Sequence, residues 1–167
     1  MTFPIRSIAA AFALAIFLAP HAARAQHAEM PMLGRWTGTF RSVLMTQETR
    51  NAGGDIGHIT GETELQPTHE SGLDLYIVKL RISTNAAAES LEWGVSMGRC
   101  GSKLIMLENA NQLPSIETRS GGEGELRHTL ALNMDAKHTY QVGLFRNGHA
   151  QQNMIACANL KYDDRMR

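Results

Sequence analysis

The sequence is poor in the features that usually indicate chemistry. Its 167 residues include only two cysteines and 6% aromatic residues, and 16 basic side chains balance 16 acidic ones. Scattered and balanced charge does not predict nucleic acid or an anionic membrane as a partner. Residues 94–98 have the Gly-x-Ser-x-Gly spacing, but this segment and the glycine clusters precede strand-like runs rather than helices, so neither a serine nucleophile nor a phosphate-binding loop is predicted. We therefore expect a non-catalytic protein without a cofactor.

One long apolar run is present, and it lies at the N-terminus. Arg6 precedes the apolar residues 8–18, and residues 23–25 (Ala-Arg-Ala) fit a small-x-small cleavage pattern. This pattern predicts a secretory signal peptide over residues 1–25, which is too short to span a membrane. No later run is long enough for a span, so we expect a periplasmic or secreted protein.

The mature chain, residues 26–167, is long enough for one domain with a substantial core. Cleavage removes two arginines and leaves a net charge near −2. Residues 26–32 are predicted to be a flexible leader, residues 33–162 a single β-sandwich domain, and residues 163–167 a polar tail.

Two cysteines in an exported chain most simply form one disulfide, here between Cys100 and Cys157. The loop that this bond closes is long, so the chain-entropy estimate gives roughly 4 kcal/mol of stabilisation. The alternative is a pair of buried free thiols.

Short alternating segments separated by turn residues run through the mature chain, and no long helical pattern is visible. Asn147-Gly148 is a strong hairpin signal before residues 151–160. Eight or nine short strands are expected in an antiparallel sandwich or barrel. They cover residues 33–45, 58–65, 73–82, 91–100, 103–108, 113–116, 125–134, 139–145 and 151–160.

Three segments carry a family resemblance: Gly98-Arg99-Cys100, the Leu-Pro and glycine-turn stretch at 113–126, and Met154–Ala158 around Cys157. Residues 61–67 are similar to an opening strand. In these pieces and their order the chain resembles the copper/zinc superoxide dismutase fold and the related chordin-type (CHRD) domains. The resemblance implies an antiparallel Greek-key β-sandwich whose last strand is joined to the loop at Cys100.

The chain departs from that family at the metal site. Val95 and Trp93 stand where the family has its histidine-x-histidine copper ligands, and Met154 stands where it has an arginine. No histidine occurs between His69 and His128. Valine and tryptophan offer no lone pair to a metal, so we expect neither a copper nor a zinc site, and no dismutase activity.

Two other motifs support alternative functions. The leader residues His27, Met30 and Met32 combine imidazole and thioether ligands, which suit copper. Gly34-Arg35-Trp36 resembles the Gly-x-Trp of lipocalins, which predicts an apolar cavity beside Trp36. The remaining histidines are expected in turns or at strand ends.

The expected function is an exported, non-catalytic binding or structural module with the dismutase-like scaffold. Its partner is an envelope or extracellular protein or ligand, bound through an exposed apolar patch. The alternatives are a periplasmic copper-binding protein that uses the leader, and a small lipocalin-like carrier of an apolar ligand.

Overall fold

The computed structural model describes residues 34–43, 58–68, 75–86, 88–109 and 112–164, and these residues belong to one compact unit. The predicted signal peptide and leader lie outside the described residues. Within them the fold is antiparallel and built from strands, as expected, but there are ten strands rather than eight or nine. They are β1 (Arg35–Ser42), β2 (Thr60–Pro67), β3 (Leu75–Ser83), β4 (Ser90–Met97), β5 (Ile105–Met106), β6 (Ile116–Glu117), β7 (Glu123–Ala131), β8 (Tyr140–Phe145), β9 (Met154–Asn159) and β10 (Lys161–Asp163).

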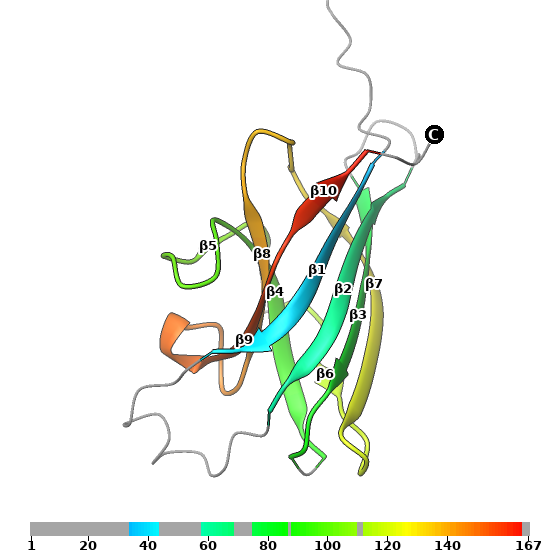
Figure 1. Cartoon of the computed structure of the whole chain (residues 1–167), viewed down its shortest axis with the longest axis vertical. Coiled ribbons are helices and arrows are strands. Elements are labelled where there is room, and N and C mark those ends of the chain that lie inside the picture. Colours follow the sequence, from blue (N-terminus) through cyan, green and yellow to red (C-terminus); the bar gives the residue numbers. More distant parts are fainter. Residues whose placement is uncertain (1–33, 44–57, 69–74, 87, 110–111, 165–167) are drawn as a thin grey trace, which may run out of the picture. The chain divides into compact units, whose positions relative to one another are not determined.

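The strands form one sheet in the order β5-β4-β8-β9-β1-β2-β3-β7, with β10 paired to β1 and β6 paired to β4. The sheet curls into a half-barrel, so that β4, β8 and β9 face β2, β3 and β7 across a shared core (Figure 1). The chain crosses between these two halves three times, after β3, between β6 and β7, and after β7, because β6 and β8 pair with β4 whereas β7 pairs with β3.

Alternation along β1 and β3 explains why these strands bury one face and expose the other. On β3, Tyr76, Val78, Leu80 and Ile82 are buried while the residues between them are more exposed. A period of two places such residues on one side of a strand, which is the side that turns toward the core. β1 follows the same rule, with Trp36 and Phe40 buried, as predicted.

β8 and β9 do not alternate, because both of their faces are covered. Every residue of β8 is buried, and in β9 only Asn159 is exposed. One face joins the main core, and the other carries a second cluster of Phe145, Met154 and Cys157. Gly143 makes this second layer possible, because a Cβ there would lie 2.7 Å from the Phe145 ring.

Two boundaries differ from the sequence expectation. Asn147 and Gly148 both have positive φ, as a hairpin signal requires, but a 3-10 helix, η2 (Gln151–Asn153), follows, and β9 begins only at Met154. Asp163, expected as the first residue of the polar tail, instead ends β10 and pairs with Arg35 of β1.

Candidate functional site

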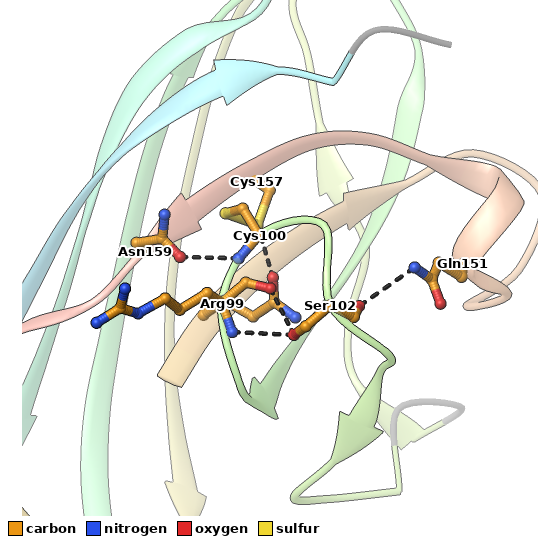
Figure 2. The surroundings of a disulfide bond; sticks show 7 residues. Arg99, Cys100, Ser102, Gln151, Cys157 and Asn159 are labelled. Atoms are coloured by element: carbon orange, nitrogen blue, oxygen red, sulfur yellow. Dashed lines mark hydrogen bonds between the residues drawn. A yellow bond between two sulfur atoms is a disulfide. The ribbon is translucent and has the colours of Figure 1, made fainter. Parts of the chain in front are cut away.

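A disulfide ties the loop after β4 to β9, across the outer side of the intervening β8. Cys100 and Cys157 are joined by an S–S bond of 2.07 Å, with their Cα atoms 5.9 Å apart and a sequence separation of 57 (Figure 2). The predicted pairing is confirmed, and the described residues include no free cysteine.

The loop that carries Cys100 is a tight turn held by its own hydrogen bonds. Gly98 and Gly101 have φ of 107° and 89°, a region that favours glycine. Ser102 Oγ accepts a hydrogen bond from Arg99 N at 3.0 Å, and Ser102 N donates to Arg99 O at 2.8 Å. The turn therefore presents Cys100 toward β9 in a fixed position.

Two further hydrogen bonds attach this turn to the rest of the sheet (Figure 2). Cys100 N donates to Asn159 Oδ1 at 2.8 Å, and Gln151 Nε2 donates to Ser102 O at 3.2 Å. Because Cys100 N is a donor, it fixes the Asn159 amide with its oxygen toward the turn and its NH₂ group directed away.

An open groove of about 870 Å³ lies next to the disulfide, on the outer side of β1. Thr37, Gly38 and Thr39 form its floor. One wall is made by Cys100, Gly101, Asn159 and Lys161, and the other by Glu62, Glu64, Lys79 and Arg81 of β2 and β3.

The strand register explains how these side chains come to one face. Thr37 lies opposite both Lys161 and Glu64, and Thr39 lies opposite Glu62. Directly opposed residues of an antiparallel pair point to the same side of the sheet, so the polar positions of four strands converge. Gly38 allows a close approach, since a Cβ there would lie 2.9 Å from Asn159 O.

The far wall of the groove is a ladder of ion pairs. Glu64 Oε1 lies 3.2 Å from Lys79 Nζ, and Glu62 Oε1 lies 3.6 Å from Arg81 Nη1. Arg81 also donates to Glu125 at 3.1 Å, and this hydrogen bond, with the charge of Glu125, raises the pKa of Arg81. These pairs are partly or well exposed, so each contributes little to stability.

A buried carboxyl group lies on the outer side of β4. Glu108 Oε1 accepts a hydrogen bond from Val95 N at 2.8 Å, while Oε2 is buried without a partner in the described structure. Burial raises the pKa of Glu108 to about 7, and the hydrogen bond from Val95 opposes the rise only in part. Glu108 does not line the groove, and it covers Gly94, where a Cβ would lie 3.1 Å from Oε1.

The predicted metal-ligating leader residues, His27, Met30 and Met32, lie outside the described residues. Among the residues that are described, no three histidine, cysteine, aspartate or glutamate side chains gather closely enough to hold a metal ion.

The sequence predicts the histidines in turns or at strand ends, but His128 does not follow this prediction. His128 lies within β7 and meets the edge of the Trp93 ring, with centroids 6.3 Å apart. His149 lies between Glu92 and the Trp93 carbonyl group. Its Nδ1 is 3.3 Å from Glu92 Oε2, and its Nε2 is 3.0 Å from Trp93 O.

The two positions that the sequence comparison aligned with copper ligands, Trp93 and Val95, belong to the core. Trp93 and Val95 are fully buried, and Trp93 Nε1 donates to Pro114 O at 2.8 Å. Trp36 is also a core residue, 3% exposed and edge-on to Tyr140, and it does not line the groove. The groove is therefore not the apolar cavity that the lipocalin resemblance predicts beside Trp36.

The expected exposed apolar patch is not found in the part of the chain that is described. There the one large hydrophobic side chain that is exposed is Ile105, at 53%. No helix of the described residues is long and apolar enough to cross a membrane.

Sequence reasoning missed the groove itself. The alternation of Thr37, Thr39 and Arg41 indicates one exposed face of β1, but the walls come from strands up to 124 residues away in sequence numbering, such as β10. In comparisons with known proteins, no family model and no curated protein matches the chain.

Proposed function

We propose that the protein is an exported, non-catalytic binding module that holds its ligand in the groove over β1. The observation that carries this proposal is the groove's position at the disulfide: strands from both halves of the sheet and a covalently fixed turn supply its walls. Rigid walls lower the entropy lost when a ligand binds.

The chemistry of the lining supports binding rather than catalysis. Each carboxylate of the groove, Glu62 and Glu64, faces a cation, and both cysteines are joined in the disulfide. Among the described residues no histidine lines the groove, and its two carboxylates are engaged in ion pairs, which supports binding over acid–base catalysis.

We propose further that the scaffold is the dismutase-like Greek key without the metals, in a periplasmic or secreted protein. The three crossings of the chain between the halves, and the bond from the turn after β4 to β9, support the scaffold. The disulfide also supports export, because such bonds persist in oxidising compartments.

The test is to map binding on the ¹⁵N-labelled mature chain, residues 26–167, by NMR. Soluble fractions of cell-envelope material are titrated, and the amides that shift are assigned. Shifts are expected in residues 37–42, 62–64 and 157–161. Binding that maps to another surface would refute the assignment of function to the groove.

A matched pair of variants sharpens this test. Thr39→Trp fills the floor of the groove and should abolish the shifts. Thr129→Trp places the same side chain on the exposed side of β7, outside the groove, and should leave them unchanged. Equal effects from both variants would also contradict the proposal.

A further inference from the structure

We propose that the groove takes an extended ligand bearing at least two carboxylate or phosphate groups, held between Arg41 and Lys161. This inference rests on the proposed function, since it names the chemistry of the ligand for the same groove.

The charges of the groove do not cancel. Four cationic side chains line it, Arg41, Lys79, Arg81 and Lys161, against the two carboxylates of Glu62 and Glu64. Lys79 and Arg81 are the partners of those carboxylates. In the described part of the chain, Arg41 and Lys161 have no ion-pair partner, so the groove keeps two cations for a ligand.

These two cations lie at different positions along β1, Arg41 on β1 itself and Lys161 on β10, which pairs with it. Lys161 is opposite Thr37, and Arg41 is opposite Cys157. Positions 37 and 41 are four residues apart on one strand, which places them about 13 Å from each other at about 3.3 Å per residue. An extended chain with repeated oxyanions can place one anionic group at each of these positions.

The groups between the two cations are hydrogen-bond donors. Thr37 and Thr39 offer hydroxyl groups, and the Asn159 NH₂ is directed away from the turn because Cys100 N occupies its oxygen. The planar guanidinium of Arg41 is suited to two parallel hydrogen bonds with a carboxylate or phosphate. Donors in a row between two charges favour oxyanions over neutral or cationic ligands.

The lining also limits the ligand in another way. The described residues of the lining include no aromatic side chain that could stack on a base or on the face of a sugar ring. Recognition therefore depends on charge and hydrogen bonds. The nearly balanced total charge of the chain does not oppose this, because binding responds to the local field of the groove.

The experiment is a calorimetric titration of the mature chain at low ionic strength with three probes. Penta-glutamate carries carboxylates along an extended backbone, linear polyphosphate carries phosphates, and penta-glutamine is the uncharged control. At least one anionic probe should bind, and binding should weaken as salt is added because exposed charges are screened. The anionic probe that binds more tightly identifies which oxyanion the groove prefers.

Variants assign the binding to the two cations. Arg41→Gln and Lys161→Gln should each weaken the anionic probe roughly tenfold. Arg127→Gln removes an exposed cation from β7, outside the groove, and should leave affinity unchanged. All three side chains are exposed, so thermal unfolding should confirm that the variants fold.

Several results would overturn the inference. These are equal binding of penta-glutamine, an equal loss in the Arg127→Gln control, or no binding of either anionic probe. If the anionic probes fail while the NMR mapping still places another ligand in the groove, only the ligand chemistry is wrong. If a probe binds but shifts amides elsewhere, the groove is not the site and both proposals fail.

Discussion

Glu108 should make the stability of the fold depend on pH between about 4.5 and 7. Its carboxyl group is buried over Gly94, and one of its oxygens has no partner in the described structure. Burial disfavours the charged form and raises the pKa from the ordinary 4.5 to about 7. The folded chain therefore holds this proton more tightly than the unfolded chain does.

The sign and size of the effect follow from that difference. Between the two pKa values the folded state binds more protons, so the free energy of unfolding falls as the pH rises. The contribution is fully present below about pH 4.5 and is lost as the pH rises through about 7. At about 1.36 kcal/mol per pKa unit, the loss is on the order of 3 kcal/mol.

Glu108→Gln isolates this contribution. The amide oxygen can still accept the hydrogen bond from Val95 N, but the side chain no longer titrates. Urea unfolding at pH 5 and pH 8 should show a fall for the wild-type chain that is smaller in the variant by up to about 3 kcal/mol. Glu123→Gln, at an exposed position of β7, should behave as the wild type. Parallel pH dependences for the wild type and Glu108→Gln would refute the reasoning.

Three other perturbations have defined outcomes. Replacing Cys100 and Cys157 together by serine should lower the free energy of unfolding by about 4 kcal/mol in urea titrations, and a loss under about 1 kcal/mol would contradict the loop-closure estimate. Gly122→Ala should destabilise severely, because its Cβ would lie 1.7 Å from a backbone carbonyl oxygen, whereas Gly101→Ala meets nothing within 4 Å and should cost only about 1 kcal/mol for its positive φ. Similar melting temperatures for these two would show that the clash is relieved. Trp93→Phe should cost roughly 2–4 kcal/mol, since it opens space in the core and leaves a backbone carbonyl without its donor; denaturation at unchanged midpoint would exclude that role.

Local patterns predicted those parts of the fold whose burial is one-sided. β1 and β3 alternate cleanly, and their predicted core residues, such as Trp36 and Phe40, are buried. The cysteine pairing was predictable because a chain with two cysteines can form only one intramolecular disulfide. These inferences need only the pattern of residues adjacent in sequence or the number of cysteines.

The candidate site could not be predicted in the same way, because it depends on register. Lys161 reaches the groove because β10 pairs with β1, whereas the sequence pattern ends the last predicted strand at residue 160. The burial of Glu108 likewise comes from a fold of the chain back over β4 at Gly94, which no local pattern indicates. The sequence predicts His128 in a turn or at a strand end, but β7 pairs with β3 along its whole length and His128 lies within the strand.

The groove and the Cys100–Cys157 disulfide have one structural origin. β1 changes partners along its length: Arg35–Thr37 pair with β10, and Arg41–Ser42 pair with β9. Between these two paired segments of β1, the chain turns from β9 into β10. Gly38 has no side chain, so this turn can approach the floor of the groove closely. The hydrogen bond from Cys100 N then fixes Asn159 at the same turn. The disulfide therefore holds the turn that orients the Asn159 amide, and we expect the ligand binding proposed for the groove to depend on the oxidised state as the stability does.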